Sequence, residues 1–166
     1  PSRSSAASDV YKRQSLSSGI SYLDKDTNLI IKGGIDDVWF DLDSKKLVVV
    51  DYKAQSNSNP VEPVSYLENQ YHQGYKIKMD IYVHILRNMK FDVSDRSYFL
   101  VCNGEKTPEK FDKKIEFTTT LIPYDTDTSW VSSKIVEMKK TLESSKIPEY
   151  NINCESCIYL ASSKTI

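Results

Sequence analysis

The chain has 166 residues, of which 39% are hydrophobic and 27% are charged, with only five glycines and six prolines. This length and composition predict a globular domain with a sizeable core and argue against a disordered or fibrous protein. The 22 Lys+Arg residues nearly balance the 23 Asp+Glu residues, so any nucleic acid would have to bind a local basic patch. Apolar runs such as LVVV at 47–50 are far shorter than the roughly 20 residues that cross a bilayer, so no membrane-spanning helix is expected.

The first residues, 1–19, are rich in serine and have no apolar period, so we expect them to be disordered. Within them, SDVYKRQ resembles translated adapter sequence, which leads us to expect that the natural N-terminus is missing. Residues 20–166 are then expected to form a single domain that lacks its N-terminal part. Three cysteines, an odd number, and no secretory leader favour a reducing compartment, and we expect a cytoplasmic protein.

Two segments rich in β-branched and aromatic residues, 28–40 and 47–54, flank the polar turn DLDSKK and predict a β-hairpin. Further along, Ser65 and Glu68 match a capping box, so a long helix is expected to begin near Tyr66. Its broad apolar face is expected to comprise Tyr71, Tyr75, Met79, Tyr82 and Leu86, with Ile77, Ile81 and Ile85 on a second flank.

The rest of the chain predicts two more strands, at 96–103 and 114–124, and a last helix from about Thr128. The buried stripe of this helix is expected to comprise Val131, Ile135, Met138 and Leu142. The predicted order of elements is therefore β-β-α-β-β-α.

The strand at 47–54 ends in Asp51 and Lys53, which strand alternation places on one face. A turn near Ser44 brings Asp36 opposite residues 51–53, at the ~5 Å where cross-strand side chains interact. Burying unpaired charge is costly and neighbouring carboxylates repel, so a compensating divalent cation is expected. Mg²⁺ prefers such oxygen ligands, and the lysine can orient or help deprotonate an attacking water. The alternative for a bare D-x-K is an exposed ion pair at a fraying strand end.

The stretch GGIDDVWFDLDSKKLVVVDYKA, residues 33–54, resembles the G-x-I-D and (V/I)-D-x-K pattern of the PD-(D/E)XK nuclease superfamily. It is most similar to RecB-like nucleases, including CRISPR-associated RecB-like exonucleases. The resemblance covers roughly residues 28–160 and implies an α/β (α+β) fold with a restriction-endonuclease-like core, a mixed central sheet flanked by helices. It also implies metal-dependent cleavage of DNA. By position, Asp36, Asp51 and the backbone carbonyl of Tyr52 would bind Mg²⁺ or Mn²⁺, and Asp36, Asp51 and Lys53 would be the catalytic residues.

RecB-like nucleases also carry Q-x-x-x-Y on the helix that follows the D-x-K strand. Here Tyr82 matches the tyrosine, but Lys78 stands at the position of the glutamine. A lysine cannot accept a hydrogen bond as an amide does, although it can reach a phosphate from the same helix face. Lys78 and Tyr82 are therefore predicted to bind substrate, and the alternative is a solvated lysine and a core tyrosine.

Near the C-terminus, Cys154 and Cys157 form a C-x-x-C, a spacing with which two thiolates bind one zinc or iron. The resemblance implies that cysteines from both chain ends surround an Fe-S cluster or zinc, so this pair is predicted to be half of such a site. Two unrelated thiols or a redox pair are the alternative. Cys102 is expected to be a small core residue, and His72 and His84 are expected to be packing or surface residues.

The leading prediction is a Mg²⁺- or Mn²⁺-dependent deoxyribonuclease, exonuclease-like, that acts on DNA in repair, recombination or defence. One alternative is a nuclease-fold module that binds nucleic acid or serves a structural role with weakened turnover, which the lysine at position 78 supports. Another is a small C-x-x-C redox or metal-binding protein.

Overall fold

A computed structural model of the protein describes residues 19–106 and 113–163. Residues 1–18, which carry almost all of the segment expected to be disordered, lie outside the described residues. The chain divides into two compact units at the boundary between Val131 and Ser132, and each unit is described by itself. No helix in the described ranges combines the length and hydropathy that crossing a membrane requires.

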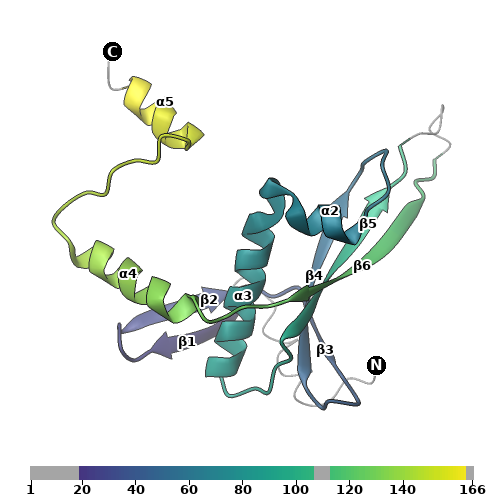
Figure 1. Cartoon of the computed structure of the whole chain (residues 1–166), viewed down its shortest axis with the longest axis horizontal. Coiled ribbons are helices and arrows are strands. Elements are labelled where there is room, and N and C mark those ends of the chain that lie inside the picture. Colours follow the sequence, from purple (N-terminus) through teal and green to yellow (C-terminus); the bar gives the residue numbers. More distant parts are fainter. Residues whose placement is uncertain (1–18, 107–112, 164–166) are drawn as a thin grey trace. The chain divides into compact units, whose positions relative to one another are not determined.

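The first unit contains two β-sheets (Figure 1). The smaller sheet pairs β1 (Ile20–Asp24) with β2 (Leu29–Gly33) in antiparallel orientation. The larger sheet has the order β3-β4-β5-β6 and comprises β3 (Asp37–Phe40), β4 (Leu47–Gln55), β5 (Arg96–Gly104) and β6 (Phe117–Asp125). β4 and β5 are parallel, whereas the other two pairs are antiparallel. This mixed sheet with flanking helices confirms the predicted fold class.

The predicted hairpin is present as β3 and β4, but the strand expected over residues 28–40 is wrong. That segment forms two strands, and the first of them, β2, belongs to the smaller sheet. Consecutive glycines at 33 and 34 interrupt the strand, as glycine disfavours regular β structure. A Cβ on Gly33 would lie only 2.6 Å from the Tyr82 ring, so glycine permits the close approach of this segment to the helix.

The long helix predicted from Tyr66 is also wrong, because three helical pieces replace it. They are α2 (Pro63–Glu68), the 3₁₀ turn η1 (Gln70–His72) and α3 (Gln73–Asn88). Ser65 does not cap a helix, since α2 begins two residues earlier with Pro63 in its first turn. The break lies at Asn69, whose backbone is extended (ψ 124°) and whose side chain accepts a hydrogen bond from the Tyr71 N–H (2.9 Å).

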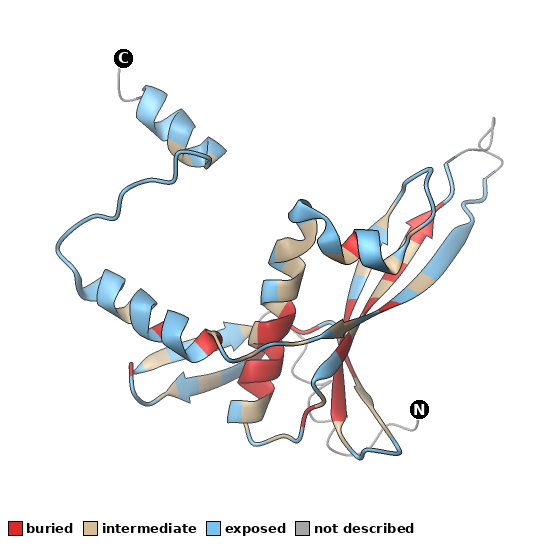
Figure 2. Ribbon diagram, viewed as in Figure 1, coloured by how far each residue is buried: buried red, intermediate tan, exposed pale blue. Residues whose placement is uncertain are grey.

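Buried side chains concentrate on α3 and on the central strands of the larger sheet (Figure 2). The buried apolar residues of α3 are Met79, Tyr82, Val83, Ile85 and Leu86. Two members of the predicted apolar face are exposed instead, Tyr71 by 81% and Ile77 by 49%. Tyr71 precedes α3, beyond the break, and the helical period places Ile77 on the side of α3 opposite Met79.

The later elements agree in part with the sequence. β5 confirms the strand predicted at 96–103, and β6 begins three residues later than the expected strand at 114–124. α4 (Val131–Glu143) begins after Thr128, and α5 (Glu155–Ser163) was not predicted. The predicted stripe of α4 is right for Val131 and Ile135, which are buried. It is wrong for Met138 and Leu142, which are 54% and 70% exposed.

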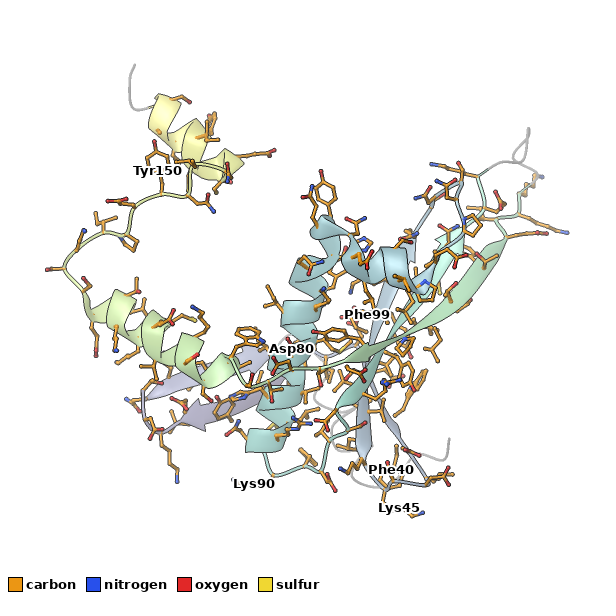
Figure 3. All side chains as sticks on the ribbon, in the orientation of Figure 1. Phe40, Lys45, Asp80, Lys90, Phe99 and Tyr150 are labelled. Atoms are coloured by element: carbon orange, nitrogen blue, oxygen red, sulfur yellow. The ribbon has the colours of Figure 1, made fainter. Side chains whose placement is uncertain are left out.

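Asp80, on α3, is a buried carboxylate that the sequence did not identify (Figure 3). Its Oδ1 accepts hydrogen bonds from the Tyr124 hydroxyl (3.0 Å) and the Asp127 N–H (3.1 Å). Its Oδ2 accepts a third from the Trp130 indole N–H (3.0 Å). Burial raises the pKa of Asp80, and these hydrogen bonds oppose that rise. The three donors tie α3 to the end of β6.

His84 gives the fold a predictable dependence on pH. Its Nε2 accepts hydrogen bonds from the Tyr22 hydroxyl (2.8 Å) and the Asn88 amide (3.2 Å), an arrangement that suits the neutral ring. Burial lowers the pKa of His84 from the ordinary value of 6.5, so the unfolded chain takes up this proton first as the pH falls. We therefore expect the free energy of unfolding to decrease as the pH drops below about 6.5.

Urea unfolding followed by circular dichroism between neutral pH and pH about 5 measures this effect. The variant His84→Gln should show a shallower pH dependence than the wild type. Parallel curves for the wild type and His84→Gln would contradict the assignment.

Candidate active site

The candidate active site lies where β4 leaves the hydrophobic core. The apolar residues from Leu47 to Val50 are buried, and Asp51 follows them with 1% of its surface exposed. Asp51 stands beside Phe99 in the register of β4 and β5. The register of β3 with β4 ends at Asp37 and Val50, which puts Asp36 one position further, opposite Asp51.

Asp36 itself is exposed, and its Oδ2 accepts a hydrogen bond from the Tyr52 N–H at 3.0 Å. The structure therefore brings Asp36, Asp51 and Lys53 together at one end of the hairpin, as the sequence predicted. The two carboxylates differ in environment. Asp36 is exposed to solvent, whereas Asp51 contacts Lys53 from β4 and Lys78 from α3.

Two ammonium groups pair with the Asp51 carboxylate. Lys53 Nζ forms an ion pair with Oδ2, and Lys78 Nζ from α3 lies 2.8 Å from Oδ1. Oδ1 is nevertheless without a hydrogen-bond donor of good geometry among the described residues, because the Lys78 contact satisfies the distance of an ion pair but not the direction of a hydrogen bond. The Lys53 side chain is 16% exposed and that of Lys78 is 40% exposed.

Aromatic rings support both lysines. Lys53 Nζ lies 4.6 Å from the centre of the Tyr75 ring, and Lys78 Nζ lies 5.5 Å from that of Tyr82. Burial and then the neighbouring Lys78 charge lower the pKa of Lys53 to about 8, against the opposing effect of Asp36. Lys53 is thus an amine that can exchange a proton near neutral pH. Tyr82, predicted to bind substrate, is buried and holds Lys78 instead of facing solvent.

The opposite face of β4 carries a separate cluster. The Tyr52 hydroxyl donates to Asp37 Oδ2 (2.5 Å), and the Trp39 indole N–H donates to the same oxygen (3.2 Å). The carbonyl of Tyr52, predicted to be a metal ligand, lies 3.5 Å from Lys53 Nζ. The sequence analysis did not identify Asp37. Strand alternation could have done so, because it places the carboxylates of the neighbouring residues Asp36 and Asp37 on different faces.

The donor set fits a divalent cation of the Mg²⁺ class. Two carboxylates and a backbone carbonyl are hard oxygen donors, and Mg²⁺ commonly uses one or two carboxylates and completes its shell with water and phosphate. The buried Oδ1 of Asp51, which already faces the Lys78 ammonium at 2.8 Å, is suited to a positive charge. No cluster of three or more His, Cys, Asp or Glu side chains within residues 19–106 and 113–163 is placed to hold a metal.

The C-x-x-C lies in the second unit, at the start of α5. Cys154 precedes the helix, and a hydrogen bond from the Cys157 N–H lowers the pKa of the Cys154 thiol. The hydrogen bond between the two thiols raises the pKa of Cys157. Cys102 is half-buried on β5 in the first unit. The half-site for zinc or an Fe-S cluster therefore stays a prediction.

The assembled residues form a small charged centre on β4, an interior strand of the larger sheet. One carboxylate is buried, one is exposed, and two ammonium groups lie beside them. Such a centre can hold a cation through its oxygens and an anionic group through its lysines.

No family model matches the chain, and no curated protein or solved structure matches it significantly.

Proposed function

We propose that the protein is a cytoplasmic, Mg²⁺- or Mn²⁺-dependent deoxyribonuclease that hydrolyses DNA phosphodiester bonds, exonuclease-like, in repair, recombination or defence. The observation that carries the proposal is the Asp51 carboxylate, 1% exposed, in the middle of β4 where the buried stretch of this strand ends, with Lys53 paired to it and Asp36 opposite. A buried carboxylate beside a lysine of lowered pKa is the kind of perturbed pair that concentrates at functional sites.

The chain's own residues supply the other parts of a hydrolytic centre. Asp36, Asp51 and the Tyr52 carbonyl would hold the metal, which when bound supplies Lewis-acid activation of water and phosphate. Lys53 can orient the attacking water or accept its proton, since its pKa is lowered to about 8. Lys78, 40% exposed, can neutralise a non-bridging phosphate oxygen.

The test is cleavage of linear DNA by the purified full chain. Single-stranded and duplex substrates labelled at either end are incubated with Mg²⁺, with Mn²⁺ and with EDTA. We expect metal-dependent degradation that EDTA stops, with mononucleotides or short products from one end. Absence of cleavage with either metal would contradict the proposal. Products cut at internal positions would show that the protein is an endonuclease and not an exonuclease.

The second candidate is a nuclease-fold module that binds nucleic acid or serves a structural role with weakened turnover. The position of Lys78 favours it, because this ammonium lies 2.8 Å from the same Asp51 oxygen that a cation would use. A positive charge there opposes binding of a second one. Such a module would bind DNA in EDTA and leave it intact when metal is added.

Lys78→Gln separates the two candidates. Removing the ammonium relieves its repulsion of a cation at Asp51, so we expect half-maximal cleavage at about tenfold lower metal concentration, or ~1.4 kcal/mol. The measurement is DNA cleavage as a function of Mn²⁺ concentration. Lys76→Gln, which changes another half-buried lysine of α3, is the matched control and should resemble the wild type.

Each result with Lys78→Gln supports one candidate. Cleavage that appears only in Lys78→Gln would identify the wild type as the weakened module. Cleavage by both the wild type and Lys78→Gln with identical metal dependence would support the nuclease and show that Lys78 does not compete with the metal.

A further inference from the structure

A polar pocket of about 300 Å³ lies at the end of β4, next to the candidate active site. Four side-chain amides line it, from Gln55, Asn57, Asn59 and Asn69, together with the rings of Tyr66 and His72. The described residues that line it include one carboxylate, Glu62, and no lysine or arginine. Its chemistry therefore differs from that of the lysine pair beside it.

A continuous row of side chains joins this pocket to the ion pair. Strand alternation places Gln55 on the same face of β4 as Lys53, ~7 Å further along the strand. Lys53 lies over the Tyr75 ring, which stacks on His72 with ring centres 5.1 Å apart. The His72 ring lines the pocket and lies 4.0 Å from that of Tyr66.

Hydrogen bonds hold the pocket walls in place. The amide of Asn103, 5% exposed, accepts from the Asn57 N–H (2.9 Å) and donates to the Asn57 carbonyl (2.9 Å). On the helical side, His72 Nδ1 bonds to the Tyr66 carbonyl (2.8 Å). A ligand therefore meets walls that are already ordered, which reduces the entropy lost on binding.

We infer that this pocket receives one unpaired nucleobase of the strand whose phosphate lies at the lysine pair, an inference that rests on the proposed function. Side-chain amides offer both donors and acceptors, as the edges of bases require, and the packed rings of Tyr66 and His72 give the pocket a rigid wall. The phosphate group can bind the cationic side chains of Lys53 and Lys78, whereas the described residues of the pocket lining include no lysine or arginine that would bind it. A base in a duplex cannot enter such a pocket without leaving its stack, so the substrate is single-stranded DNA or a frayed end.

Binding in EDTA tests this inference without cleavage. Fluorescence anisotropy of the full chain is measured with a fluorescein-labelled mixed-sequence oligonucleotide, with its blunt duplex and with an oligonucleotide of abasic sites. We expect the single strand to bind about tenfold more tightly than the other two. Gln55→Ala and Asn57→Ala should weaken binding of the single strand severalfold and leave duplex binding unchanged. Gln70→Ala, at an exposed amide outside the pocket lining, is the control.

The comparison of the mixed-sequence and abasic oligonucleotides uses only the wild-type protein, so it tests the inference even if a substitution disturbs folding. Equal affinity for all three DNAs, or no binding, would refute the inference that the pocket binds a base. The nuclease proposal would then still be tested separately by the cleavage assay. A preference for single strands that depends on Gln55 and Asn57, without cleavage in Mg²⁺ or Mn²⁺, would uphold the pocket and refute the nuclease.

Discussion

Asp51→Asn is expected to lower metal-dependent DNA cleavage by at least about 100-fold. The substitution keeps the size and planarity of a side chain that is 1% exposed, but it removes the charge on which a divalent cation depends. Initial rates of cleavage at saturating Mn²⁺ measure the effect. Because Lys53 keeps its charge beside the new amide, some loss of stability is expected, and rates are compared below the melting temperature of the variant.

Asp37→Asn is the matched control for this experiment. Asp37 belongs to the same hairpin, but its carboxylate bonds to Tyr52 and Trp39 on the opposite face of β4. Cleavage by Asp37→Asn should stay close to that of the wild type. Undiminished cleavage by Asp51→Asn would refute the assignment of Asp51 as a metal ligand.

Lys53→Met is expected to reduce cleavage by a similar factor, about 100-fold or more, with little change in DNA affinity measured in EDTA. Methionine matches the length of the aliphatic stem and can pack on the Tyr75 ring, but it cannot move a proton. Lys78 still neutralises Asp51 in this variant, so the circular dichroism spectrum should be unchanged.

A loss of cleavage explained by a loss of DNA affinity would make Lys53 a binding residue. The control is Lys46→Met, at a lysine just before the same strand whose ion pair with Asp92 (3.7 Å) lies at the other end of the hairpin. Its cleavage rate should equal that of the wild type.

The sequence predicted that Asp36, Asp51 and Lys53 lie close together because the rules that place these three residues are local. A run of apolar residues specified β4, alternation put Asp51 and Lys53 on one face, and a short turn brought Asp36 across. The same reasoning missed the break at Asn69, because the apolar period continues through it in the sequence. A helical period does not show where the axis changes direction.

Contacts between distant segments were the other limit. The Lys78 contact with Asp51 depends on where α3 crosses β4, and the sequence gives only the face on which Lys78 lies. Asp80 likewise receives its donors from Tyr124 in β6 and from Asp127 and Trp130 just after that strand, at least 44 residues along the chain. No short-range pattern encodes such partners, so a buried carboxylate looks like any polar residue of a helix.

The parallel pairing of β4 with β5 determines how the charged centre is covered. Parallel neighbours cannot be joined by a tight turn, so the chain must return across a face of the sheet. The segment that returns is α2, η1 and α3, and it places the rings of Tyr75 and Tyr82 against Lys53 and Lys78. The shielding of the two lysines is thus a product of chain connectivity and requires no separate lid.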